Sequence, residues 1–367
     1  MTPLRSQRLG SRLKDLAEAL DLSVSTVSAA MQNRPDISES TRRRVFRKAK
    51  ELNYRPNWLA RSLALNKTQV LGIVIPDLSR SFFPQILKGI GEVARNSAYH
   101  LLICSTDDDP QREDDEIATL IGKQVDGLIV ASSRRPGQNG YWQSLKRMGV
   151  PMVLVDRAFP AMPSVAADNE RIGYIATEHL IQQGYRNIAH LARTDVLTGI
   201  GRRQGYLAAL RDGGLKVRRT YILEAQGESG GSEGVQRLLA MRPRPDAVFA
   251  ASDPIAIGAM EAVQAAGLRI PTDFGIIGVG RASYGEYLRI PLSTVDQHPF
   301  EIGKTAASVL LGMIAGKPAP ASPVLMNPTL IVRDSSCRIP ENGVAVKYLL
   351  SAYESEKRTE PLASVAR

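Results

Sequence analysis

The first fifty residues carry apolar side chains at helical spacing. A first helix is predicted by a stripe at positions i, i+3, i+4 and i+7, formed by Leu13, Leu16, Ala17 and Leu20. Asp21 and Leu22 follow as a tight turn. Ser23 is a suitable N-cap for a second helix, whose Val27 and Met31 face inward. Two short helices joined by such a turn predict a helix-turn-helix.

A third helix and a short hinge complete this opening segment. The helix is predicted to begin near Ser38 and to stop at Asn53, which tolerates a left-handed backbone. Pro56 ends any continuing helix, and residues 57–63 span only about two turns, too few to be helical alone in water. We expect this hinge to become ordered on DNA, with Leu63 inserted between base steps of the minor groove. An ordinary linker with one helical turn is the alternative.

Positive charge is concentrated in this opening segment. Residues 1–68 contain 14 Lys and Arg against six Asp and Glu, which gives +8 of the total formal charge of +10. A compact basic module gains affinity for phosphates by releasing counterions, whatever the DNA sequence. The run TRRRVFRKAK lies on the predicted third helix. We therefore interpret it as part of a nucleic-acid-binding module rather than as a solvated basic face.

From Val70 onward the chain alternates short apolar runs with helical stretches. The runs are VLGIVIP, HLLICST, VDGLIVAS, PMVLVD, IAHLA, DAVFAAS and GIIGVG. Such a succession is typical of parallel strands joined by crossover helices, so the fold class of this part is α/β with doubly wound sheets. Its length favours two lobes over one. Ligands of such sheets bind near the carboxyl ends of the strands.

Six motifs follow one another along the chain: LSVSTVS, PDISESTRRRV, LNYRPNWLARSL, LGIVIPDLSRSFFPQILKGI, DNERIGYIATEHLIQQGYRNIAHL and PLSTVDQHPFEIGKTAASVL. In this order they resemble the lactose-repressor/galactose-repressor family of bacterial transcription regulators, from about Leu13 to Ile339. The resemblance implies a body similar to periplasmic sugar-binding proteins, with two lobes, three chain crossings and a cleft for a small effector. Lobe one would take residues 69–166 and about 298–327. Lobe two would take the interval and the segment to about 340.

The same resemblance places DNA contacts on the opening segment. Val24, Ser25 and Ala29 stand where the family reads bases, and of these Val24 and Ala29 offer only apolar contact. The expected DNA-binding residues are Ser23, Val24, Ser25, Thr26, Ser28, Ala29, Asn33, Tyr54, Pro56, Asn57, Ala60, Arg61 and Leu63. The family usually has Arg or His where Ala29 stands. We therefore expect weaker base discrimination from the second helix and more reliance on the hinge and on DNA shape.

In the body, strand ends and the resemblance together indicate an effector site. The expected effector-binding residues are Phe82, Phe83, Ser133, Asp156, Arg157, Asp168, Arg202, Ser252, Asp253 and Arg281. An arginine at a cleft offers a forked donor to a carboxylate or to vicinal hydroxyls. Where the family commonly has Asp, this chain has Gly280, which removes an acceptor for sugar hydroxyls. The expected effector is a carbohydrate or a sugar acid, unless the cleft has lost its ligand.

Other chemistries find little support in the sequence. Cys104 and Cys337 form no CxxC pair and the four histidines lack ligand spacing, so no disulfide framework, metal site or cofactor is expected. GIGRRQG lacks the spacing of a dinucleotide fingerprint. The acidic run DDDPQREDDE is interpreted as a solvated helix start. No catalytic arrangement, signal peptide or membrane span can be located, which favours a cytoplasmic protein without enzymatic activity.

The sequence thus predicts a homodimeric transcription regulator, most simply a repressor, whose operator affinity is set by a small effector. Its expected parts are a helix-turn-helix domain at 1–55, a hinge at 56–68, a two-lobed effector-binding and dimerisation core at 69–340 and a disordered tail at 341–367. The second helix would enter the major groove of a pseudo-palindromic operator. A solute-binding or chemoreceptor-type protein, an effector-independent DNA-bending protein and an enzyme with an accessory DNA domain are the alternatives.

Overall fold

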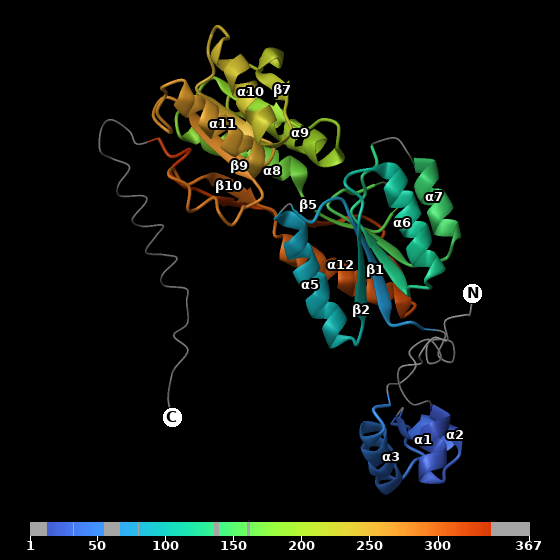
Figure 1. The fold of residues 1–367 in the computed structure, drawn as a ribbon. Helices are drawn as coiled ribbons and strands as arrows, with labels where there is room; N and C mark the ends of the chain where they lie inside the picture. The colour runs from blue at the N-terminus through green and yellow to red at the C-terminus, as the bar shows by residue number, and fades with distance from the viewer. Residues whose placement is uncertain are drawn as a thin grey trace, which may run out of the picture. The chain divides into compact units, whose positions relative to one another are not determined.

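Two compact units make up the chain, Met1–Gln69 and Val70–Arg367 (Figure 1). The computed structural model describes residues 13–31, 33–54, 67–79, 81–135, 139–159 and 162–338. The expected tail and the hinge residues Pro56, Asn57, Ala60, Arg61 and Leu63 lie outside the described residues.

The described part of the N-terminal unit is a small helical domain. Its helices are α1 (Leu13–Leu20), α2 (Val24–Met31) and α3 (Glu39–Glu51). Their buried side chains are Leu16, Ala17, Val27, Ala30, Val45 and Ala49. Met31, expected to face inward, packs at the edge of this core and stays half-buried, while Ala30 takes the inner position three residues after Val27. The predicted helix-turn-helix is thereby confirmed.

Polar and left-handed residues set the limits of α3. The Oγ of Ser38 accepts a hydrogen bond from the backbone N–H of Thr41 at 3.2 Å, so Ser38 is the N-cap. At the other end Asn53 has a φ of 48°, and the N–H of Tyr54 donates to the carbonyl of Ala49 at 2.8 Å. This closing turn needs a residue that tolerates the left-handed region, as Asn does.

Lobe one contains a sheet in which every adjacent pair of strands is parallel, in the order β11-β5-β4-β3-β1-β2. Its strands are β1 (Val70–Ile75), β2 (His100–Ser105), β3 (Gly127–Val130), β4 (Met152–Val155), β5 (Ser164–Ala167) and β11 (Val324–Met326). Its helices are α5 (Phe82–Asn96), α6 (Pro110–Gly122), α7 (Asn139–Arg147) and α12 (Pro299–Ile314). As Figure 1 shows, α5 and α12 cover one face of the sheet, and α6 and α7 cover the other.

Lobe two repeats this architecture, with strands in the order β12-β10-β9-β8-β6-β7. They are β6 (Ile188–Ala192), β7 (Ile222–Glu224), β8 (Ala247–Ala250), β9 (Gly275–Val279), β10 (Ser293–Asp296) and β12 (Thr329–Ile331), which runs antiparallel to β10. The helices are α8 (Asn169–Gln182), α9 (Leu197–Asp212), α10 (Gly227–Leu239) and α11 (Asp253–Ala265), with a 3₁₀ turn at Arg219–Tyr221. One face of the sheet packs on α8 and α9, the other on α10 and α11.

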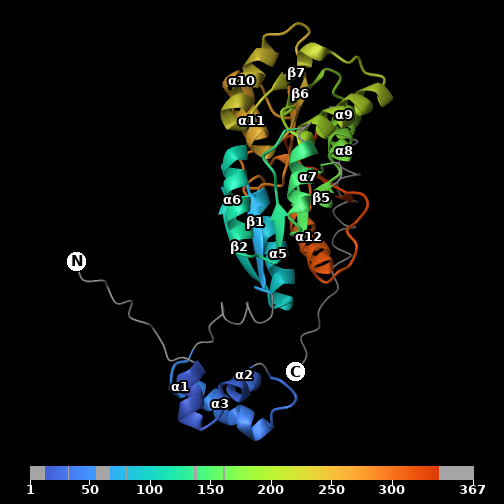
Figure 2. The ribbon, with the colours of Figure 1, turned by 90° about the vertical axis from the view of Figure 1, so that its right-hand side faces the viewer.

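The described chain crosses between the lobes three times. The crossings follow β5, β10 and β11, so that α12 returns from lobe two to pack against α5 in lobe one (Figure 2). This packing needs glycine on both helices. A Cβ at Gly89 would overlap the carbonyl of Phe300, and one at Gly303 would overlap the carbonyl of Ile86. The two helix backbones therefore lie in direct contact.

The predicted two-lobed α/β architecture is confirmed, and each of the seven predicted apolar runs contains a strand. The strands β5, β7, β10, β11 and β12 were not predicted, because none of them lies within one of the longer apolar runs, whereas the equally short β3, β4 and β8 do. Across the described part of the chain, no helix has the length and apolar character that a membrane crossing would require.

Candidate functional site

The second helix of the N-terminal unit presents a small, mostly uncharged surface. Val24 is 45% exposed, Ser25 is exposed and Ala29 is half-buried, while Val27 and Ala30 point into the core. The residues expected to read bases therefore share the outer side of α2. Their side chains offer a hydroxyl and two apolar contacts, which supports only limited readout of base edges.

Several of the expected DNA-contacting residues also stabilise this unit. Ser23 Oγ accepts from the backbone N–H of Thr26 at 3.0 Å and lies 2.7 Å from the hydroxyls of both Ser25 and Thr26. Asn33 is exposed with a φ of 54°, where Asn costs little, and Tyr54 packs against the helical core. Ser23 thus serves first as the cap of α2.

Two arginines of the basic run are used inside the unit. Arg42 Nη2 donates to the carbonyls of Arg34 at 3.0 Å and Ile37 at 3.1 Å. Arg44 Nη2 donates to the carbonyl of Leu20 at 3.3 Å, at the end of α1. These bonds tie α3 to the preceding loop and to α1. Arg42 and Arg44 of the basic run therefore stabilise the fold of the unit, and the other basic residues of the run are the candidates for phosphate contacts.

A cavity of about 530 Å³ lies between the two lobes of the body. The expected effector-binding residues that line it are Phe82, Phe83, Asp156, Arg157, Arg202, Ser252 and Asp253. The first four come from lobe one and the others from lobe two. Because they follow strands or begin helices at the carboxyl edges of two parallel sheets, the fold brings them together across the crossing segments.

Three expected effector residues lie outside the lining of this cavity. Ser133 donates its N–H to Glu113 Oε2 at 2.5 Å and its hydroxyl lies 3.3 Å from that of Thr106. Asp168 is the N-cap of α8 and accepts from the N–H of Arg171 at 2.9 Å. Arg281 pairs with Asp296 at 2.9 Å beside a neighbouring cavity of about 600 Å³. Each is held by local partners that sequence spacing did not reveal.

Arg202 is held in the cavity wall by three hydrogen bonds. Its guanidinium donates to Asn169 Oδ1 at 2.9 Å, to the carbonyl of Ala251 at 2.5 Å and to Gln297 Oε1 at 2.6 Å. All three acceptors are neutral, and burial lowers the pKa of Arg202 to about 10. The residue still carries its charge at neutral pH. It therefore presents a fixed positive group with no carboxylate bonded to it.

Asp253 brings a buried carboxylate to the same wall. Its Oδ1 accepts from the Thr294 hydroxyl at 2.6 Å and its Oδ2 from the N–H of Ala282 at 2.7 Å. Burial raises the pKa of Asp253 against the opposing effect of these hydrogen bonds. Gly280, which stands where the family commonly has Asp, has a φ of 129°. A residue with a side chain would be strained in this conformation, so the loop backbone itself favours glycine over an acceptor here.

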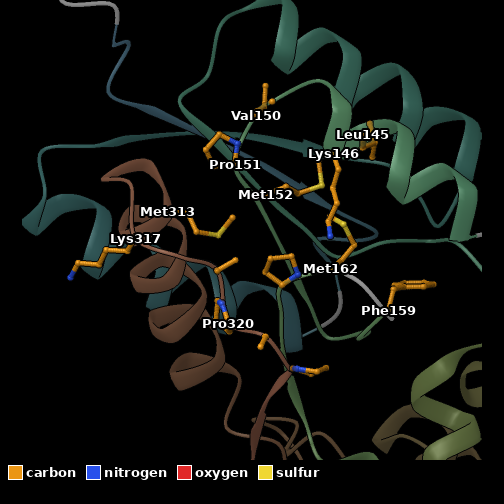
Figure 3. A pocket seen from close by; sticks show the side chains of 15 residues that line it. Leu145, Lys146, Val150, Pro151, Met152, Phe159, Met162, Met313, Lys317 and Pro320 are labelled. Carbon is orange, nitrogen blue, oxygen red and sulfur yellow. The ribbon is translucent and has the colours of Figure 1, made fainter.

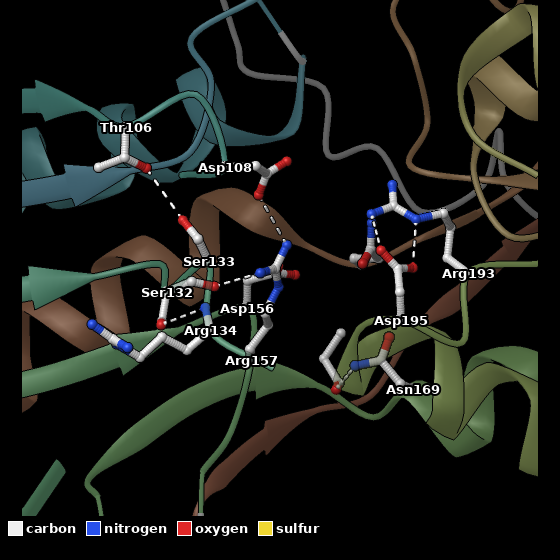
Figure 4. A network of polar contacts seen from close by, with 12 residues as sticks. Thr106, Asp108, Ser132, Ser133, Arg134, Asp156, Arg157, Asn169, Arg193 and Asp195 are labelled. Atoms are coloured by element: carbon white, nitrogen blue, oxygen red, sulfur yellow. Dashed lines mark hydrogen bonds and ion pairs between the residues drawn. The ribbon is translucent and has the colours of Figure 1, made fainter. Parts of the chain in front are cut away.

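Lobe one contributes a second arginine, Arg157, to the cavity wall (Figure 4). Arg157 is only 5% exposed; its Nη1 donates to the carbonyl of Ser132 at 2.5 Å and its Nη2 to Asp108 Oδ1 at 3.3 Å. Across the cavity, Arg193 forms a two-pronged pair with Asp195, at 2.8 and 3.0 Å. Arg157 and Arg193 are therefore each paired with a carboxylate of the protein, unlike Arg202.

Aromatic rings supply the apolar part of the cavity. Phe82 and Phe83 begin α5 and meet edge to face, with ring centroids 5.3 Å apart. Phe83 is 3% exposed and belongs to the core of lobe one, while Phe82 is half-buried and available to a ligand. Tyr284, which sequence reasoning missed, lines the lobe-two side.

Sequence reasoning also missed Arg193 and Gln297 as cavity-lining residues. Arg193 directly follows β6, so the strand-end rule applied to IAHLA would have found it. Gln297 follows β10, which was not recognised as a strand. Its part in holding Arg202 could be seen only once the chain crossing beside it was known.

A different cavity, of about 540 Å³, lies in lobe one between the end of α7, the segment after β4 and the chain that follows α12 (Figure 3). Its walls are mostly apolar and include Leu145, Met152, Phe159, Met162 and Met313, with Lys146 and Lys317 as the charged residues. It lacks the convergent polar groups that orient a small polar ligand. The cavity between the lobes is therefore the better candidate for the effector site.

The acidic run at residues 107–116 was interpreted as a solvated helix start, and for Glu113 this interpretation is wrong. Asp109 does cap α6, but Glu113 is fully buried, and its carboxylate accepts hydrogen bonds from Ser132 and Ser133 instead of water. Within the described residues no group of three or more His, Cys, Asp or Glu is arranged to hold a metal ion.

A helix-turn-helix unit, joined in one chain to a two-lobed body with a polar cavity between its lobes, defines a DNA-binding regulator with a sensing domain. Residues 12–57 match the family described as bacterial regulatory proteins, lacI family, and residues 177–336 match the periplasmic binding protein-like domain. The chain belongs to the LacI family of bacterial transcription regulators, as the resemblance predicted.

Curated relatives of the whole chain carry the same assignment. The ribose operon repressor of Haemophilus influenzae is 33% identical over 334 residues, covering 88% of this chain and 98% of the relative. The transcriptional repressor CytR of Escherichia coli K12 is 32% identical over 342 residues, covering 92% and 99%. These relatives are transcription regulators rather than enzymes. The prediction of a DNA-binding transcription regulator is thereby confirmed.

Solved structures agree with the fold. The complex of the transcriptional regulator CelR with cellobiose has a TM-score of 0.67 and 27% identity, covering 89% of this chain and 99% of that one. The lac repressor dimer bound to operator and the anti-inducer ONPF has a TM-score of 0.80 and 23% identity, over 89% and 99%. Both are similar to this chain over its two units.

Proposed function

We propose that this protein is a homodimeric repressor whose operator affinity is controlled by a small ligand bound between the lobes. The observation that carries the proposal is the convergence of Arg157 from lobe one with Arg202 and Asp253 from lobe two on one cavity. A ligand that touches both lobes changes the angle between them, and a change of angle can reach the DNA-binding unit through the hinge. The expected parts are residues 1–55, 56–68, 69–340 and 341–367.

The ligand is a carbohydrate or a sugar acid. Planar guanidinium groups and carboxylates on facing walls suit vicinal hydroxyls, which both donate and accept, and the Phe82 ring suits the C–H face of a sugar. Arg202, which no carboxylate binds directly, can also receive the acid group of a sugar acid. The cellobiose complex of CelR and the relative that represses a ribose operon support this class.

On DNA, each protomer places α2 in the major groove of one half-site, while the paired hinges enter the minor groove between the half-sites. The small side chains of Val24 and Ala29 leave much of the specificity to the hinge and to DNA shape. Such a protein acts in the cytoplasm, where operator DNA lies, and needs neither a cofactor nor a catalytic group.

Selection from random duplexes, followed by titration with sugars, tests this function. We expect a pseudo-palindromic site of two half-sites, and an affinity for it that changes with D-ribose, cellobiose or one of a panel of their acids. DNA binding that is indifferent to sequence would instead identify an architectural DNA-bending protein. A strongly fixed guanine opposite Ala29 would contradict the expected reliance on hinge and shape.

A further inference from the structure

A buried carboxylate stands directly behind the lobe-one wall of the interlobe cavity. Glu113 lies on α6 and is 0% exposed. Its Oε1 accepts from the Ser132 hydroxyl at 2.8 Å and its Oε2 from the N–H of Ser133 at 2.5 Å. Removing such a carboxylate would leave two buried donors without acceptors, so the turn after β3 depends on it.

The turn that Glu113 holds also holds Arg157. The carbonyl of Ser132 accepts from Arg157 Nη1 at 2.5 Å, and Asp108 accepts from Nη2 at 3.3 Å (Figure 4). The guanidinium is thus fixed at both terminal nitrogens. Its buried Nε has no hydrogen-bond partner in the described structure and lies 3.8 Å from Asp156 Oδ2, beside the cavity.

The turn is fixed from its other end as well. The N–H of Arg134 donates to Ser132 Oγ at 3.0 Å, and the Arg134 guanidinium pairs with Asp114, the neighbour of Glu113 on α6. The same guanidinium lies 3.5 Å above the ring centre of Tyr141 on α7. Residues 132–134 are therefore held between two helices and have little freedom to move unless the buried carboxylate is removed.

We propose that Glu113 is a positioning residue of the effector site, which acts through Ser132 to fix the orientation of Arg157. Arg157 is the donor that lobe one offers to a ligand, and a donor is selective only when its geometry is held by the residues behind it. The proposal rests on the proposed function for the identity of the cavity. The position of Arg157, however, can be measured without any ligand.

Chemical modification of the full-length protein with phenylglyoxal, an arginine reagent, tests the proposal. Mass spectrometry follows the labelling rates of Arg157 and of Arg202, which lines the same cavity but is held by Asn169, Ala251 and Gln297. In Glu113→Ala we expect Arg157 to be labelled about tenfold faster, the ratio for one lost charge-assisted hydrogen bond. Arg202 should be labelled at the wild-type rate.

Two further variants distinguish a specific loss of the Arg157 orientation from a general loosening of lobe one. Asp115→Ala, on the exposed side of the same helix, should leave both rates unchanged. Glu113→Gln keeps one carbonyl acceptor and should bring Arg157 most of the way back to the wild-type rate. An unchanged Arg157 rate in Glu113→Ala, or an equal rise for Arg157 and Arg202, would overturn the proposal.

If Glu113→Ala does not fold, Ser132→Ala decides the question, because it removes one donor to Glu113 and leaves the carbonyl that Arg157 uses. A rise in the Arg157 rate supports the positioning role, and an unchanged rate overturns it. With D-ribose or cellobiose as the probe, Ser132→Ala should lower the affinity of the wild type but cause no further loss in an Arg157→Ala background. Failure of every sugar to bind would count against the proposed function, while the labelling rates would still decide the role of Glu113.

Discussion

At the residue scale, Arg202 shows how a buried charge can be kept ready for a ligand. It is 8% exposed, and its three hydrogen bonds go to a side-chain amide, a backbone carbonyl and a second amide. Neutral acceptors satisfy the donors without neutralising the charge. A ligand oxygen that approaches the guanidinium therefore meets an electrostatic attraction that water screens only weakly at this depth.

Arg202→Ala should abolish ligand-dependent stabilisation of the body while leaving operator binding without ligand nearly intact. A ligand at about 100 times its Kd stabilises the folded state by about 2.7 kcal/mol, so the loss is readily seen as a missing rise in Tm. Arg203→Ala is the matched control, because Arg203 is the next residue of α9 and is exposed. An undiminished rise in the Arg202 variant would remove this residue from the site.

His190 makes the stability of lobe two depend on pH. Burial between Tyr206 and Phe249 lowers its pKa to about 4, well below its usual value of about 6.5. The unfolded chain therefore binds a proton at a higher pH than the folded chain does. The contribution of His190 to the free energy of unfolding is fully present above about pH 6.5 and is lost as the pH falls toward 4. The loss amounts to about 3 kcal/mol at the lower limit.

Urea unfolding at pH 7.5 and pH 5 measures this dependence. His190→Phe keeps an aromatic ring in the stack but cannot be protonated, so its stability should fall less between the two pH values than that of the wild type. Since His179 is also buried with a pKa lowered to about 4, part of the dependence should persist. Equal slopes in His190→Phe and wild type would contradict the assignment.

At the element scale, sequence patterns predicted those elements whose residues must face a core. Helix α1 carries an apolar stripe at helical spacing, and strands such as β1 and β9 are apolar runs that are buried along almost their whole length. β10, with the sequence STVD, has no such run, so its place in the sheet became clear only from its pairing with β9 and β12. Arg202 was expected as a lining residue from the family resemblance, whereas its partner Gln297 follows β10, a strand that the sequence did not reveal.

The cap of α3 should contribute measurably to the stability of the N-terminal unit. Ser38→Ala removes the acceptor of the Thr41 N–H and should cost about 1 kcal/mol. Thermal unfolding of the unit, followed by helical circular dichroism, measures the loss. Ser40→Ala, two residues further along the exposed first turn, should cost clearly less, and equal losses would show that the Ser38 hydroxyl is not acting as a cap.

The hinge should act as a specificity element. Leu63→Ala should weaken binding to the selected operator far more than binding to random duplex, because an apolar wedge between base steps is used only where the hinge is fully engaged. Fluorescence anisotropy with the two duplexes at one salt concentration measures both affinities, since nonspecific binding depends steeply on salt. Equal losses on both duplexes would refute the wedge.

At the scale of the whole molecule, ligand and operator should influence one another equally. If cellobiose or D-ribose changes operator affinity by a given factor, the operator must change the affinity for that sugar by the same factor, about 5- to 150-fold for typical coupling. Titration of each partner with and without the other measures both factors. A sugar that binds in the cavity without altering operator affinity would show that the lobes do not control the DNA-binding unit.

The return of α12 to lobe one has a consequence for how the protein is made. Residues 299–314 cover a face of the first sheet, yet the ribosome must first synthesise all of α8 to β10, which belong to lobe two. Throughout that interval the nascent first lobe exposes the apolar surface of β3, β4 and β5 that α12 later covers. Newly made chains should therefore need chaperone protection longest at this face, and translation that stops before residue 299 should leave an aggregation-prone fragment rather than a working lobe.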